Sequence, residues 1–212
     1  MDIKNTIEFV LPKDIEARSF ELIGEELKEK NIVLDSEQEP VTKRVIHTTA
    51  DFEYAQTMTY SKDAIKIARE LIKNGADIVT DTNMAKAGIN KTTLTKFGGE
   101  VHCFMADEDV AAEAKKRQVT RATVSMEKAA LIKKPVIFAI GNAPTALISL
   151  YEMMEQQKFK PAFVIGVPVG FVNVVQAKEL FVESDVPYII NRGRKGGSNV
   201  AAAIVNALMY GI

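Results

Sequence analysis

Hydrophobic residues in the first third of the chain recur at the three- and four-residue spacing of amphipathic helices. We expect the first helix over residues 13–30, with Ile15, Leu22 and Ile23 on its apolar face. Ser19 lies on the same face, and its hydroxyl either bonds back to its own helix or contacts a ligand. Two further helices are expected over residues 41–58 and 61–73.

The pattern changes after Gly75, where short and nearly continuous apolar runs alternate with helical segments. Continuous apolar runs are typical of strands buried on both faces, and their alternation with helices favours a parallel sheet. The expected strands cover residues 76–80, 100–105, 135–140, 162–166 and 187–190. The expected helices cover residues 107–117, 123–132, 144–157, 173–183 and 198–210.

These elements predict an α/β protein, a three-layer α/β/α sandwich with a mainly parallel five-stranded sheet and an N-terminal helical segment. The length of 212 residues favours a single domain over residues 1–212. Within it, residues 1–75 are expected to be largely helical, and residues 76–212 to form the parallel α/β part.

Composition narrows the classes of function. Lys and Arg total 27 against 28 Asp and Glu, and this formal net charge of −1 disfavours a nucleic-acid binder. We expect no membrane association, because the chain has neither an apolar run of about 20 residues nor a signal-peptide pattern. Cys103 is the one cysteine, which excludes an internal disulfide and fits a reducing, cytoplasmic location.

Ligands of open α/β sheets bind beyond the carboxyl ends of the strands, and here these loops are rich in glycine and polar residues. They contain neither the dinucleotide fingerprint nor the Walker A spacing. They still favour anions, because a helix begins at Pro144 and another follows Arg192, Arg194 and Lys195. The alternative interpretation of residues 192–198 is a solvated basic turn.

The chain has two histidines, of which His102 lies within an expected strand and is interpreted as structural. His47 is a candidate general acid. If its segment is helical, Asp51 lies one turn further on and would raise the pKa of His47, whereas Arg44 would oppose this effect. Metal catalysis and Ser–His–Asp hydrolysis are poorly supported, since no second histidine lies at ligand spacing and no Gly-x-Ser-x-Gly motif exists.

At these loops the sequence resembles the precorrin-8X methylmutase family, which includes the cobalt-precorrin-8 methylmutases of corrinoid biosynthesis. The resemblance covers nearly the whole chain, and the matching motifs together are quite specific. They are Ile15–Phe20, Arg44–His47, Asp81–Ile89, Thr120–Arg121, Gly141–Leu147, Gly166–Val172 and Arg192–Ser198.

The resemblance implies an isomerase that moves a methyl group from ring carbon C11 to C12 of (cobalt-)precorrin-8, giving hydrogenobyrinate or cobyrinate. It implies no cofactor, because the shift is intramolecular and cobalt, if present, is carried by the substrate. His47 matches the catalytic histidine, which protonates a ring nitrogen, and the family members are homodimers. The substrate-binding residues expected from the resemblance and the loops are Ser19, Asn83, Arg121, Gly141, Asn142, Arg192, Arg194, Gly197 and Ser198; no metal-binding residue is expected.

Residues 48–52 differ from the glycine-containing sequence of many members of the metal-free pathway, which favours the cobalt substrate. Two alternatives remain open. One is a non-catalytic carrier that binds corrinoids or other tetrapyrroles in the same pocket. The other is a nucleotide- or flavin-dependent α/β enzyme, which the absence of both phosphate fingerprints disfavours.

Overall fold

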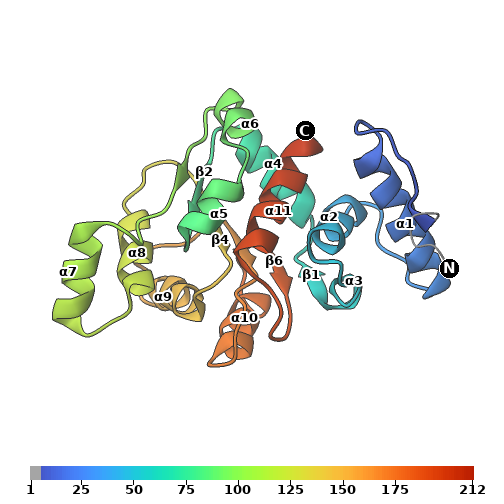
Figure 1. The fold of residues 1–212 in the computed structure, drawn as a ribbon. Helices are drawn as coiled ribbons and strands as arrows, with labels where there is room; N and C mark the ends of the chain where they lie inside the picture. Colours follow the sequence, from blue (N-terminus) through green and yellow to red (C-terminus); the bar gives the residue numbers. More distant parts are fainter. Residues whose placement is uncertain (1–5) are drawn as a thin grey trace.

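The protein is described by a computed structural model over residues 6–212. A six-stranded sheet in the order β1-β6-β5-β4-β2-β3 lies between two layers of helices (Figure 1). Every neighbouring pair is parallel except β1 and β6, which are antiparallel. The strands are β1 (Met58–Tyr60), β2 (Asp77–Thr80), β3 (Val101–His102), β4 (Val136–Ile140), β5 (Phe163–Gly166) and β6 (Tyr188–Asn191).

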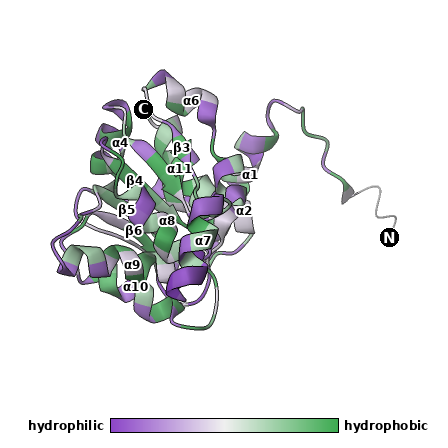
Figure 2. Cartoon of the chain, turned by 90° about the vertical axis from the view of Figure 1, so that its left-hand side faces the viewer, coloured by the Kyte–Doolittle hydropathy of each residue, from purple (hydrophilic) through white to green (hydrophobic). Residues whose placement is uncertain are grey.

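The central strands bury both of their faces, which is why their sequences are continuously apolar. Successive side chains of a strand point to opposite faces, so Ile137 and Ala139 pack in one core while Phe138 and Ile140 pack in the other. In Figure 2 the strands are largely hydrophobic, and the hydrophilic residues gather on the outer helices. The helices are α1 (Ile15–Glu29), α2 (Glu39–Thr49), α3 (Tyr54–Thr57), α4 (Ala64–Lys73), α5 (Asn83–Gly88), α6 (Lys91–Lys96), α7 (Glu108–Arg117), α8 (Arg121–Ala129), α9 (Pro144–Glu155), α10 (Val174–Val182) and α11 (Ser198–Tyr210).

The predicted α/β class and mainly parallel sheet are confirmed, but the predicted strand number was wrong. The missing strand is β1, which lies at the end of the segment predicted as one helix over residues 41–58. That helix ends at Thr49, because Ala50 adopts a left-handed conformation with φ of 53°. Asp51 then accepts a hydrogen bond from the amide of Glu53 (3.0 Å), which stabilises the turn into α3.

Three smaller differences concern the flanking elements. Helices α5 and α6 occupy a stretch that the sequence left without predicted helices, and β3 is shorter than the predicted strand over residues 100–105. The apolar face of α1 is only partly buried, since Ile15 is 53% and Leu22 46% exposed, whereas Ile23 is buried. Among the described residues 6–212, no helix combines the length and the hydropathy that crossing a bilayer requires.

Candidate functional site

The loops that follow the carboxyl ends of β2, β4, β5 and β6 come together, as the strand pattern predicts. Gly141 packs so closely on the next loop that a Cβ atom there would lie 2.7 Å from the carbonyl oxygen of Gly197. A Cβ atom on Gly196 would lie 2.0 Å from the carbonyl oxygen of Val167. Glycine is therefore required at both positions for the loops to meet, which explains the glycines in these segments.

A buried carboxylate occupies the centre of this junction. Asp81, directly after β2, accepts hydrogen bonds from the amides of Gly141 (2.9 Å), Asn142 (2.8 Å) and Ala143 (2.5 Å). Gly141 and Asn142 were predicted to bind the substrate, but their amides here donate to a side chain of the protein itself. Of the two predicted residues Gly141 and Asn142, only the side chain of Asn142 remains exposed.

The predicted residues Asn83, Gly197 and Ser198 lie at the starts of α5 and α11. The Ser198 hydroxyl is 2.7 Å from that of Thr82, which also accepts the Ala85 amide and so caps α5. Asn83 is exposed and Gly197 is buried. The contact between the two hydroxyls fixes the two helix starts relative to each other.

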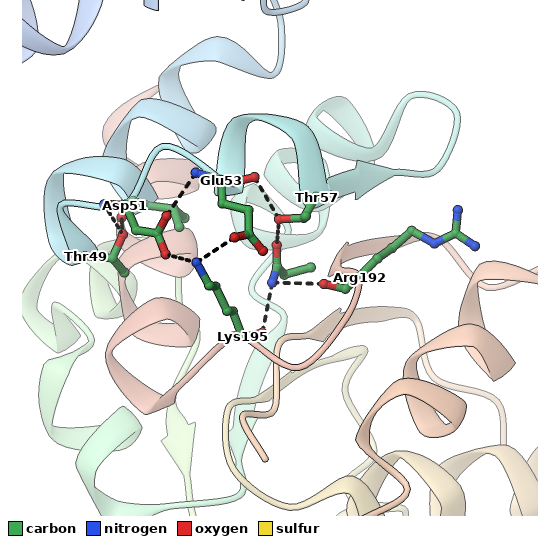
Figure 3. A network of polar contacts seen from close by, with 8 residues as sticks. Thr49, Asp51, Glu53, Thr57, Arg192 and Lys195 are labelled. Atoms are coloured by element: carbon green, nitrogen blue, oxygen red, sulfur yellow. Dashed lines mark hydrogen bonds and ion pairs between the residues drawn. The ribbon is translucent and has the colours of Figure 1, made fainter. Parts of the chain in front are cut away.

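The basic loop over residues 192–198 uses two of its three cations internally. Lys195 Nζ lies 2.6 Å from Asp51 and 2.8 Å from Glu53, so it joins this loop to the turn after α2 (Figure 3). The ion pair with Lys195 lowers the pKa of Asp51 below its ordinary value. Arg192 points away from this cluster (Figure 3), and its Nε binds Glu179 of α10 at 3.0 Å.

Arg194 and Arg121 remain without a carboxylate partner among residues 6–212. The guanidinium of Arg194 lies over the ring of Phe171, 5.4 Å from its centroid. Arg121 is the exposed first residue of α8, and Thr120 just before it bonds to Thr145 of α9 (3.1 Å between hydroxyls). Within this described part of the chain, two guanidinium groups are therefore free of carboxylate partners, that of Arg194 in the loop between β6 and α11 and that of Arg121 at the start of α8.

His47 lies in the last turn of α2 with its imidazole exposed. Its ring stacks on that of Phe20 in α1, with the ring centroids 5.3 Å apart and the planes at 14°. The predicted partnership with Asp51 was wrong: α2 ends before Asp51, whose carboxylate binds Lys195 instead. Stacking on Phe20 thus orients the imidazole, and nothing in the sequence spacing pointed to this contact.

Ser19 precedes Phe20 in α1 and is half-buried. Its hydroxyl donates to the carbonyl oxygen of Ile15 (2.9 Å), which is the intrahelical alternative left open by the sequence. Ser19 is thus adjacent in sequence to the residue that orients His47, and its oxygen lone pairs can still accept from a ligand.

Exposed apolar side chains border the same loops. Phe171 is 81%, Val172 79% and Met84 71% exposed, although large apolar side chains are normally buried.

A separate groove of about 870 Å³ lies between α1 and α2 and is lined by Phe20 and Lys43 among others. Lys43 lies one helical turn before His47, so one end of this groove approaches the imidazole.

Known proteins resemble this chain in both sequence and fold. The sequence profile of the precorrin-8X methylmutase family matches residues 14–211. The chain belongs to this family. Its members are isomerases of cobalamin biosynthesis that move a methyl group, and the chain is an enzyme of that class.

Among its relatives is the cobalt-precorrin-8 methylmutase of Priestia megaterium, 45% identical over 199 residues, covering 94% of this chain and 88% of the relative. The cobalt-precorrin-8 methylmutase of Salmonella typhimurium is 42% identical over 203 residues, covering 94% of this chain and 95% of the relative. The solved precorrin-8X methylmutase of Thermus thermophilus has a TM-score of 0.81 at 37% identity, covering 93% of this chain and 96% of that one.

Proposed function

We propose that this chain moves the methyl group from C11 to C12 of precorrin-8 or cobalt-precorrin-8, with His47 as the general acid. The observation that carries the catalytic role is the exposed imidazole held against Phe20. Membership of the methylmutase family supports the reaction. His47 donates a proton to a ring nitrogen of the macrocycle, which favours the shift. The bond between the methyl group and C11 breaks as its bond to C12 forms, and the proton then returns to His47.

The residues at the carboxyl ends of the strands suit such a substrate. The macrocycle is largely apolar and carries acetate and propionate carboxylates around its edge. Arg194 and Arg121 offer two separate guanidinium groups, which bind carboxylates with two parallel hydrogen bonds. Phe171, Val172 and Met84 offer exposed apolar surface for the ring system.

Because the methyl group stays within one molecule, the proposed reaction uses neither a methyl donor nor a redox cofactor. We favour the cobalt-containing substrate, which enters with its metal already bound. The relatives that are 45% and 42% identical are both named cobalt-precorrin-8 methylmutases, and residues 48–52 of this chain favour the same choice.

We further propose that the enzyme works in the cytoplasm as a homodimer. The single cysteine, Cys103, is compatible with a reducing compartment. The exposed apolar side chains of Ile15 and Leu22 on α1 offer a surface that a second copy of the chain can cover.

The test is a His47→Ala variant, with Thr48→Ala as the matched control on the same exposed turn. Both are mixed with cobalt-precorrin-8, and conversion is followed by absorption. General acid catalysis contributes about 10²–10⁴-fold to rate, so we expect kcat of His47→Ala to fall by at least about 100-fold. The control should convert the substrate at nearly the unmodified rate.

Rearrangement by His47→Ala at the unmodified rate would contradict the role of the histidine. Stoichiometric binding of the substrate by the unmodified protein without any conversion would instead identify a carrier. Binding of the product alone cannot distinguish an enzyme from a carrier, so turnover is the decisive measurement.

A further inference from the structure

The carbonyl groups of the basic loop converge on one buried side chain, Lys178 of α10. Its Nζ donates to the carbonyl oxygens of Gly193 (2.8 Å) and Lys195 (2.9 Å), the two residues that flank Arg194. The carbonyl oxygen of Arg194 accepts from the amide of Gly170 (3.2 Å). Three consecutive carbonyl groups of the loop are therefore held by the body of the protein.

Lys178 is unusual for a lysine, because its side chain is fully buried. Among the described residues no carboxylate lies within ion-pair distance of it, since the neighbouring Glu179 binds Arg192. Burial lowers the pKa of Lys178 to about 8. A buried ammonium without a carboxylate partner is costly, so its hydrogen bonds to the loop are what accommodate it in the fold.

A second buried side chain supports the same arrangement. Asn191, the last residue of β6, donates from Nδ2 to the carbonyl oxygen of Lys195 (2.8 Å) and accepts at Oδ1 from Thr57 (2.6 Å). The loop has no regular secondary structure of its own. Side chains from α10 and β6 satisfy the carbonyl groups of Gly193 and Lys195 on either side of Arg194.

We propose that Lys178 is a positioning residue, which holds the loop in the conformation that presents Arg194 to a carboxylate of the substrate. With the backbone held on both sides of Arg194, its guanidinium extends over Phe171. A preorganised guanidinium binds a carboxylate more tightly, because less side-chain and loop entropy is lost on binding. The inference rests on the proposed function only for the identity of the bound carboxylate.

The first test measures the loop itself. We expect Lys178→Met to accelerate amide hydrogen exchange at Gly170 and Gly197, whose amides bond to Arg194 and Val167. Gln176→Met, an exposed position on the same helix, serves as the control and should leave exchange unchanged. Should Lys178→Met not fold, Lys178→Gln provides a second variant that keeps two N–H donors on a shorter side chain.

The second test measures the coupling between Lys178 and Arg194 by the dissociation constant of cobyrinate. We expect Lys178→Met and Arg194→Gln each to weaken binding about 10-fold. If Lys178 acts through Arg194, the double variant should bind no more than about 10-fold more weakly than the unmodified protein. If Lys178 has only a structural role that is independent of Arg194, the two effects multiply, and the double variant should bind cobyrinate about 100-fold more weakly.

These outcomes separate the inference from the proposed function. Unchanged exchange in the loop, or multiplying effects on binding, overturns the role of Lys178 even in an active enzyme. Failure of the unmodified protein to convert the substrate overturns the proposed function, whereas the exchange result still decides whether Lys178 holds the loop.

Discussion

Arginine side chains at the carboxyl ends of the strands differ in what they can still bind. Arg192 and Arg194 are two residues apart and were both predicted to contact the substrate. The structure gives Arg192 a carboxylate partner, Glu179, while Arg194 lies over an aromatic ring. A guanidinium already paired must lose its partner before it binds another carboxylate, so the two residues should contribute unequally.

We therefore expect Arg194→Gln to raise KM for the tetrapyrrole substrate by about 10- to 100-fold with little change in kcat. The reason is the loss of a charge-assisted hydrogen bond worth about 1.5–3 kcal/mol, made equally in the ground and transition states. Arg192→Gln should change KM less than about 5-fold, since its guanidinium is already paired with Glu179 and an exposed ion pair contributes at most about 1 kcal/mol. Steady-state kinetics of both variants checks this, and equal effects would contradict it.

At the scale of elements, the loop after β4 depends on the carboxylate of Asp81 rather than on a ligand. We expect Asp81→Asn to lower the free energy of unfolding by about 1–3 kcal/mol, because an amide cannot accept from all three backbone N–H groups. Urea unfolding at pH 7 measures the change. Asp63→Asn is the matched control, since Asp63 is exposed and its side chain caps no helix. An equal loss of stability in both variants would contradict the role of Asp81.

The elements themselves were largely predictable wherever hydrophobic periodicity is strong. Strands β2, β4, β5 and β6 and helices α7 to α11 follow from continuous apolar runs and amphipathic stretches. The break after α2 was not predictable in this way, because it depends on one left-handed residue, Ala50, and on turn contacts of Asp51. Strand β1 was missed because it is short and pairs only with β6, so no apolar run marks it in the sequence.

The site was predictable at the level of loops but not of contacts. The sequence predicted that the glycine-rich and basic loops lie at neighbouring strand ends, and the fold does bring these loops together. The partners Phe20 and Lys178 come from helices distant in sequence from the residues they hold. Such long-range pairing is set by tertiary packing, which no local spacing encodes.

At the scale of the whole molecule, Lys178 makes stability depend on pH. Its pKa is about 8 in the folded protein and ordinarily 10.5, so between these values the unfolded chain binds more protons. We expect the contribution of Lys178 to raise the free energy of unfolding as pH rises from 8 to 10.5, by at most about 3 kcal/mol. Urea unfolding at pH 7.5 and pH 10 measures the rise, and Lys178→Met should lack this part of it. Equal pH slopes in the two proteins would contradict the prediction.

The buried carboxylate of Asp81 also bears on selectivity in a cell that is rich in ATP and inorganic phosphate. Many α/β folds capture phosphate with free amides at the start of a helix beyond the sheet. Here the corresponding amides of Gly141, Asn142 and Ala143 already donate to the carboxyl oxygens of Asp81, so they are not free to bind a phosphate. The side chain of Asp81 thus occupies the amides that a phosphate group would need, and abundant nucleotides cannot bind through them.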